Sequence, residues 1–190
     1  MRTILLSLPM IFGNVAYSQG PVQVAANQSD LTTGIIHGPN HAYMITAPKG
    51  WVLDNEVWAE GGIFAVFYKV NCSIDTSPIV AYTMVQEKLP QGIEAHIKAD
   101  MVHTLKGSKT AKVVRHTPIK SGDGRIGIVY SVVGVPKQNP EWMAYIDAPT
   151  VYILVSVSVR DVKDFTEGQK LLKDLVSSVS WFTDQVQYNK

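Results

Sequence analysis

Cysteine is almost absent from this chain of 190 residues, which contains a single one, Cys72. One cysteine cannot form an intramolecular disulfide, so burial and hydrogen bonding have to stabilise the fold. Lipid attachment is excluded, because the cysteine would have to follow directly after a signal sequence, and Cys72 lies far downstream. Two hypotheses stay open for the free thiol: a structural residue, or a nucleophile paired with a histidine.

A large excess of charge of either sign is also absent. The chain has 17 lysines and arginines against 16 aspartates and glutamates, and loss of Arg2 by processing would equalise the two. This balance argues against nucleic-acid binding driven by whole-domain electrostatics, which requires a clear basic excess. Bulk charge therefore identifies no partner.

Only the N-terminus contains a long apolar run. It begins directly after Met1-Arg2 and ends at the small residues of Ala16-Tyr17-Ser18. This pattern predicts a cleavable signal peptide over residues 1–18 and export to the periplasm or beyond. The alternative is an N-terminal membrane anchor, but Pro9, Gly13 and Asn14 interrupt a stretch already shorter than the roughly 20 residues that span a bilayer. No later segment predicts a membrane span.

The remaining chain has the length of one domain and shows no internal repeat. Residues 19–39 are polar and weakly periodic, which predicts a flexible leader. We expect the domain itself over residues 40–184 and a short tail over 185–190.

Alternating and β-rich patterns predict most of the strands. They cover His41–Ala47, Ile63–Lys69, Pro78–Lys88, Val113–Ile119, Arg125–Val135, Trp142–Asp147 and Thr150–Arg160. The second and third are expected to pair, Ser121-Gly-Asp-Gly124 is expected to form a hairpin turn, and the last is apolar enough for a central strand.

Two segments have helical periodicity. In Gly92–Lys106, the residues Ile93, Ile97, Met101 and Leu105 recur every fourth position and predict one broad apolar face. In the second segment Asp161 is expected to cap a helix with a buried stripe formed by Phe165, Leu171, Leu172, Leu175, Val176, Val179 and Phe182. The order of elements predicts an α+β fold, in which helices cover a largely antiparallel sheet.

Three features resemble the PsbP-like α/β/α sandwich family, which includes DcrB and a yeast Ran-binding nuclear import factor. They are Ala47–Asp54 after the first strand, the long strand Val151–Arg160, and the closing helix ending at Ser178–Phe182. The chain is most similar to small secreted bacterial members. The resemblance implies the sandwich fold and a role in binding other proteins or assisting assembly, without a shared catalytic site.

A polar stripe runs along the first predicted helix. His96, Asp100 and His103 lie on one flank beside the apolar face, and His96 and Asp100 are spaced to share a metal ion. The alternative is a solvated flank, because His103 is about 10 Å further along the axis. His37 and His41 fall in a segment with Gly38 and Pro39 and are interpreted as incidental histidines of a loop.

Basic residues are concentrated between Lys98 and Arg125. They outnumber acidic residues by five in this segment, and Lys109, Lys112 and Arg115 are the candidate binding residues. The alternative is a solvated surface, because strand alternation would distribute these side chains over both sheet faces.

The sequence thus favours an exported, non-catalytic protein-binding or assembly module of the cell envelope, with another envelope protein as partner and no cofactor. One form of this hypothesis is an immunity or inhibitor protein directed against a toxin. The alternative is a hydrolase or thiol-dependent enzyme that uses Cys72 with a histidine, although no Gly-x-Ser-x-Gly elbow is present and no catalytic residue is predicted.

Overall fold

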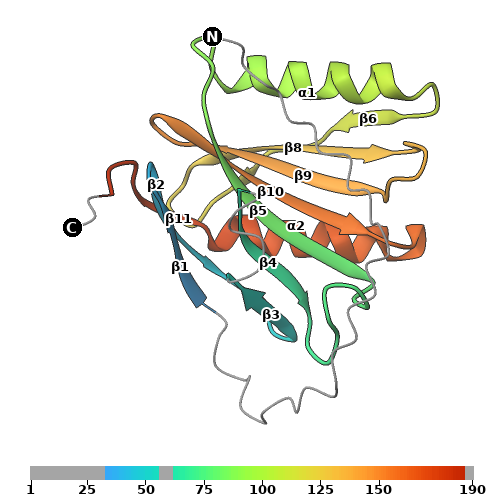
Figure 1. Ribbon diagram of the computed structural model, residues 1–190, viewed down its shortest axis with the longest axis horizontal. Coiled ribbons are helices and arrows are strands. Elements are labelled where there is room, and N and C mark those ends of the chain that lie inside the picture. The colour runs from blue at the N-terminus through green and yellow to red at the C-terminus, as the bar shows by residue number, and fades with distance from the viewer. Residues whose placement is uncertain (1–32, 56–61, 187–190) are drawn as a thin grey trace.

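The computed structural model describes residues 33–55 and 62–186, which form two antiparallel sheets and two α-helices (Figure 1). The predicted signal peptide, most of the predicted leader and the last four residues of the predicted tail lie outside the described residues. In chain order the elements are β1 (Thr33–Gly38), β2 (His41–Thr46), β3 (Trp51–Asp54), β4 (Ile63–Lys69), β5 (Ile79–Glu87), α1 (Ile93–Gly107), β6 (Lys112–Arg115), β7 (Ile119–Lys120), β8 (Ile126–Val133), β9 (Glu141–Asp147), β10 (Val151–Val159), a short 3-10 helix (Val162–Asp164), α2 (Phe165–Ser178) and β11 (Ser180–Thr183).

The large sheet has the strand order β3-β4-β5-β10-β9-β8-β6, and β7 adds to β8. Every strand pairing within it is antiparallel. Strand β10 occupies the centre, as its apolar sequence predicts, and β4 pairs with β5 as expected. These observations confirm the predicted α+β class.

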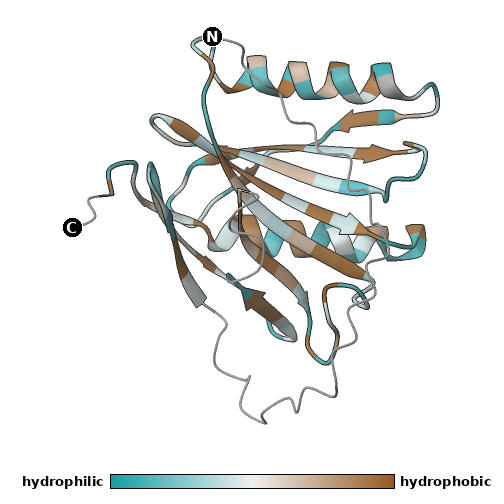
Figure 2. Cartoon of the chain, viewed as in Figure 1, coloured by the Kyte–Doolittle hydropathy of each residue, from teal (hydrophilic) through white to brown (hydrophobic). Residues whose placement is uncertain are grey.

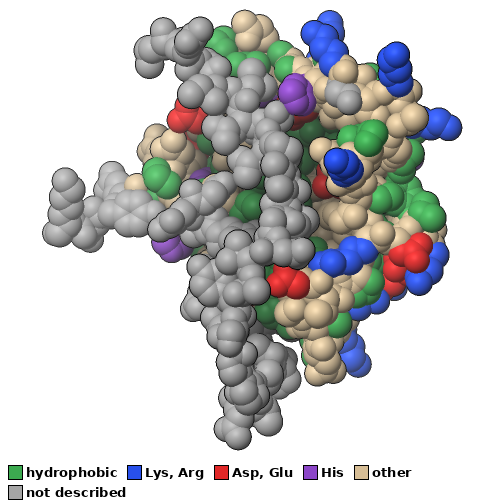
Figure 3. Space-filling view, turned by 45° about the vertical axis from the view of Figure 1, so that its right-hand side comes forward, with side chains coloured by type: hydrophobic (Ala, Val, Ile, Leu, Met, Phe, Trp, Pro, Cys, Tyr) green, Lys and Arg blue, Asp and Glu red, His purple; other side chains and the backbone are tan. Residues whose placement is uncertain are grey.

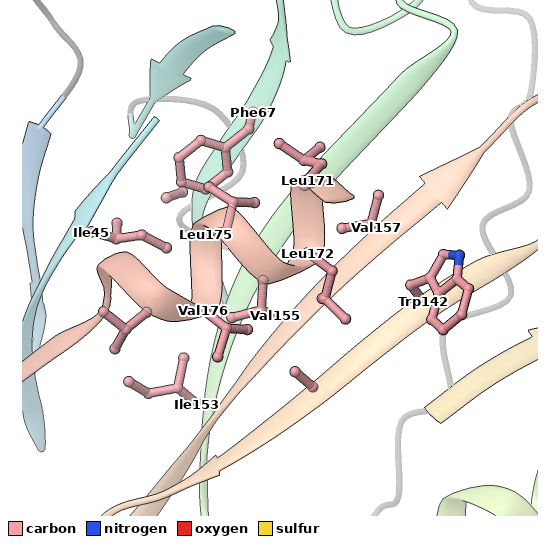
Figure 4. Close-up of a cluster of buried hydrophobic side chains, with 14 of the residues drawn as sticks. Ile45, Phe67, Trp142, Ile153, Val155, Val157, Leu171, Leu172, Leu175 and Val176 are labelled. Carbon is pink, nitrogen blue, oxygen red and sulfur yellow. The ribbon is translucent and has the colours of Figure 1, made fainter. Parts of the chain in front are cut away.

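Helix α2 covers one face of this sheet and forms the main core (Figure 4). Leu171, Leu172, Leu175 and Val176 are buried on the helix and meet Ile153, Val155 and Val157 of β10. Burying one such side chain stabilises the fold by about 1.5–3 kcal/mol, so this contact is a major part of the stability. Apolar and polar residues alternate along both helices, as expected when one helical face packs on a sheet (Figure 2).

A small sheet with the order β1-β2-β11 lies beside α2 and shares its layer (Figure 1). Tyr43 and Ile45 of β2 are fully buried, and the Tyr43 hydroxyl is 2.7 Å from that of Thr83 on β5. The small sheet is therefore anchored to the large one by both apolar packing and a buried hydrogen bond.

Helix α1 packs on the opposite face, where Ile97 and Met101 contact Tyr145 of β9 and Tyr152 of β10. Leu105, predicted on the same apolar face, is 48% exposed. A spacing of four residues advances about 40° around a helix at each step, so Leu105 has turned about 80° away from Ile97.

The N-terminal boundary of the fold differs from the prediction. Residues 33–38 form β1 instead of part of a leader, and β1 pairs with β2 along its whole length. The segment with two histidines is accordingly a tight β-hairpin, and His41 is buried in β2 with 3% exposure. Gly38 permits this packing, because a Cβ atom there would collide with the imidazole ring.

The C-terminal boundary also differs. Helix α2 ends at Ser178, because Val179 adopts extended backbone angles, and β11 follows and pairs with β2. Phe182, predicted in the helical stripe, is 53% exposed on this strand. Asp161 caps the short 3-10 helix that precedes α2, where its side chain accepts a hydrogen bond from the Lys163 amide.

Two strand predictions need correction as well. Trp51–Asp54 forms β3, which is not among the predicted strands. The strand predicted over Val113–Ile119 is divided into β6 and β7, and Pro118 in the interruption lacks the N–H that a continuous ladder requires.

Candidate functional site

A basic surface follows the exposed flank of α1 and continues through the loop to the first residue of β6, and we call it the basic end. It consists of Lys98, Lys106, Lys109 and Lys112, all exposed. Lysine and arginine side chains spread over this end of the molecule in Figure 3. Within the described ranges none of the four amines forms an ion pair, so their charges are available to a partner.

Arg115, the third predicted binding residue, is already engaged. Its guanidinium donates to Glu94 on α1 at 3.0 Å and lies 5.7 Å from the centre of the Tyr130 ring. Strand alternation places it on the α1 face of β6, with Val113, and Lys112 on the other face. Lys109 and Lys112 thus belong to the basic end, whereas Arg115 ties β6 to α1.

Two apolar side chains interrupt the lysines of α1. Val102 is 41% exposed and Leu105 is 48% exposed, and both lie within about 40° of Lys98 around the helix axis. The three residues form one flank of the helix, roughly 90° from the direction of Ile97 and Met101. Apolar side chains within a cationic surface are typical of protein contacts, because burial supplies affinity and charge supplies orientation. The spacing of residues 98, 102 and 105 is visible in the sequence and could have identified this surface.

The predicted polar stripe of α1 is only partly solvated. His96 and Asp100 are partly buried against the sheet, and His103 is exposed. The Tyr145 hydroxyl donates to Asp100 Oδ2 at 3.2 Å, and the His96 ring lies 5.0 Å from that of Tyr152. Burial raises the pKa of Asp100, while the Tyr145 hydrogen bond and the nearby histidines lower it.

These contacts give His96 and Asp100 structural partners. His96 Nε2 accepts a hydrogen bond from the Leu89 amide at 2.6 Å, which fixes the loop between β5 and α1. These hydrogen bonds occupy Nε2 of His96 and Oδ2 of Asp100, so a metal ion would have to use Nδ1 and Oδ1 or displace them. In the part of the chain that the structure describes, no three histidine, cysteine or acidic side chains converge as a metal site.

Cys72 lies in the loop after β4, at the opposite end of β5 from His96. Its amide donates to the Lys69 carbonyl, whereas His96 contacts Leu89 beyond the other end of β5. The nine residues of β5 span roughly 27 Å, so the thiol and this imidazole are not within hydrogen-bond reach. The hypothesis that Cys72 acts as a nucleophile with His96 as its base is therefore wrong.

Two shallow clefts are lined by described residues. One, of about 400 Å³, lies near Glu87 and Thr150, where Thr150 donates to Asp184 and Asn40 donates to Glu87. The other, of about 360 Å³, lies between Trp51 and α2, where Glu167 pairs with Lys69. Asn40, Glu87, Thr150 and Asp184 of the first cleft are thus paired with one another. In the second cleft Lys49, Lys170 and Asp174 form no hydrogen bond or ion pair with the described residues.

No helix in the described ranges is both long and apolar enough to cross a membrane.

Neither a protein-family model nor a curated protein matches this chain. Among solved structures it is similar to that of cyanobacterial PsbP (CyanoP) from Synechocystis sp. PCC 6803, at 14% identity and a TM-score of 0.51, over 86% of this chain and 100% of that one. A structure from Bacteroides thetaiotaomicron aligns at 12% identity over 77% of this chain and 47% of that one, with a TM-score of 0.36. The first comparison supports the predicted PsbP-like fold; the resemblance to DcrB and the Ran-binding factor stays a prediction. The chain therefore has the fold of PsbP, and this likeness alone assigns no activity.

Proposed function

We propose that this chain is an exported, non-catalytic module that binds an acidic protein of the cell envelope through its basic end. The observation that carries the proposal is the combination of four unpaired lysines with exposed Val102 and Leu105 on one end of the molecule. An acidic partner would neutralise the lysines and bury the two apolar side chains, and each effect favours association.

The position of the basic end supports this role. Strand β6 is an edge of the large sheet, so a partner can approach it without disturbing the core. Lysines at an edge also oppose pairing with the edge strands of other molecules, which makes nonspecific sheet association unfavourable. The surface thus favours a charge-matched partner over an extended strand.

The alternatives have less support. The enzyme hypothesis has no nucleophile and base in Cys72 and His96, because the two residues lie at opposite ends of β5. An inhibitor or immunity protein is a particular form of the proposed binding function and would use the same surface.

Zero-length carbodiimide cross-linking in intact cells tests the proposal, because this reagent joins an amine only to a carboxylate that touches it. We expect cross-linked peptides between residues 98–112 and acidic residues of one envelope protein. Changing Lys106, Lys109 and Lys112 to glutamate should weaken binding of that protein by at least about tenfold, since reversed charges now face its carboxylates.

A matched control reverses Lys120, Lys170 and Lys173, which are exposed elsewhere on the molecule. Both triple variants change the net charge equally, so an effect of charge alone would weaken binding in both. Equal loss in the two variants, or cross-links distributed evenly over all lysines, would contradict the proposal. The localisation is tested separately by deleting residues 1–18. We expect this deletion to abolish export of the chain.

A further inference from the structure

The sheet face that carries α1 has a second, differently charged region. Helix α1 packs against β6 and β9. On the same face, the strand register brings Val66, Tyr82 and Ser156 into one row across β4, β5 and β10. The next row contains Ser158 and Glu141, directly opposite each other on β10 and β9. We call Tyr82, Glu141 and Ser156 the acidic notch.

Glu141 is the only charged side chain of the notch. It is mostly buried, and it forms neither a hydrogen bond nor an ion pair with any described residue. Burial without a partner disfavours the carboxylate and raises its pKa to about 7. A buried carboxylate without a counter-charge destabilises a fold, and a cation bound beside it would offset that cost.

A second polar group at the same place also lacks a partner. The Ser156 hydroxyl is fully buried, faces Tyr82 and has no hydrogen bond of good geometry with the described residues. Tyr82 is close enough to Glu141 for the carboxylate to raise the tyrosine pKa in addition to the effect of burial. The two carboxylate oxygens of Glu141 and the hydroxyl oxygens of Tyr82 and Ser156 are thus four hydrogen-bond acceptors on three neighbouring strands.

The chemistry of these groups favours an alkylammonium ion. An ammonium group has three N–H donors and no acceptor, which matches one carboxylate and two hydroxyl oxygens. Calcium needs six to eight oxygen ligands, and Glu141 is the only carboxylate of the notch. Met143 on β9 pairs with Ser156 on β10. Its side chain and the Tyr82 ring provide apolar surface for a methylene chain.

We propose that the acidic notch binds an alkylammonium group, such as the lysine side chain of a protein segment laid across β5, β10 and β9. This site is separate from the basic end and has the opposite charge. The inference is therefore independent of the proposed function, and either can fail without the other.

The test uses Nα-acetyl-lysine methylamide as the probe and the full mature chain labelled at its methionine methyl groups. At pH 8 we expect the Met143 methyl resonance to shift with a millimolar dissociation constant. The matching norleucine derivative, which lacks the ammonium group, should bind at least about tenfold more weakly. Glu141→Gln should weaken binding of the lysine probe by a similar factor.

Glu87→Gln is the matched control, because Glu87 is an exposed acid of β5 that bonds Asn40 outside the notch. It should leave probe binding unchanged. Methionine methyl spectra report the fold of each variant before titration. Absence of a Met143 shift with the lysine probe, equal binding of the norleucine probe, or unchanged binding to Glu141→Gln would each overturn the proposal.

Discussion

His41 is buried and Glu141 is mostly buried, and the surroundings of both disfavour the charged form. For His41, burial and the positive charge of neighbouring His37 lower the pKa to about 4. Its ring lies 4.4 Å from that of Phe64, and its Nε2 atom has no hydrogen-bond partner among the described residues. Both side chains therefore couple protonation to folding, but with opposite signs.

His41 should make the protein less stable as the pH falls. Unfolding exposes an imidazole with a pKa near 6.5, so the unfolded state takes up the proton first. Between pH 6.5 and 4 this side chain should cost on the order of 1–3 kcal/mol of stability. Urea unfolding of the wild type and of His41→Leu across this range measures the difference, and parallel stability curves would contradict the assignment.

Glu141 should act in the reverse direction. Its folded pKa of about 7 exceeds the ordinary value of 4.5, so its contribution is complete below pH 4.5 and is lost as the pH rises through 7. Glu141→Gln, which carries no charge, should be about 1–3 kcal/mol more stable than the wild type at pH 8. The two proteins should converge at pH 4.5, as measured by denaturant unfolding; a constant difference would show that Glu141 does not titrate near 7.

Among the secondary-structure elements, α2 depends on close contact with the sheet. Gly168 lies on its buried side, and a Cβ atom there would be 2.6 Å from Val159 Cγ2 on β10. Alanine favours helix by about 1 kcal/mol over glycine, whereas overpacking a core costs about 1–3 kcal/mol. Because the space is so small, we expect the steric cost to dominate.

Gly168→Ala should therefore lower the free energy of unfolding by about 1–2 kcal/mol. Ser177→Ala, at an exposed position of the same helix, is the control and should change stability by less than about 0.5 kcal/mol. Chemical denaturation gives both values. A stabilised Gly168→Ala variant would mean that α2 moves away from β10 at little cost.

Over the whole molecule, β11 holds the two sheets together. It pairs with β2 of the small sheet, and the Trp181 amide donates to Asp123 in the turn between β7 and β8. The Gly122 amide donates to the carbonyl of Val179, whose side chain is fully buried. Burial alone would raise the pKa of Asp123. Hydrogen bonds from Ser121, Trp181 and Arg125 outweigh this effect and keep the pKa below its ordinary value.

Truncation after Ser178 should consequently remove one of the connections between the sheets and leave the contact between Tyr43 and Thr83. We expect the melting temperature to fall by at least about 10 °C, or the cooperative transition to disappear, because several hydrogen bonds and the buried Val179 are lost together. Truncation after Val186 removes only residues beyond β11 and should leave the melting temperature unchanged. Thermal unfolding followed by circular dichroism distinguishes the two, and equal stability would contradict this role of β11.

Local patterns in the sequence were sufficient for the elements whose periodicity extends over many residues. The continuous apolar run of β10 predicted a central strand, because a strand covered on both faces is apolar on both. The apolar stripe of α2 predicted a covering helix, because residues that recur at helical spacing share one face. The order of these elements then predicted the α+β class. The basic segment with Lys109 and Lys112 is also visible in the sequence, and its role in binding stays a prediction.

Tertiary structure alone decided the positions that depend on distant partners. Strands β3 and β11 have four residues each, too few for a clear repeat, and β1 contains two glycines, which are uncommon in strands. They pair with the edges of β2 and β4. Arg115 is engaged because Glu94 and Tyr130 come within reach only after α1 packs on β6. In the sequence Glu141 has the appearance of an ordinary surface acid. Strand pairing over more than fifty residues places it beside Tyr82 and Ser156, and burial there raises its pKa.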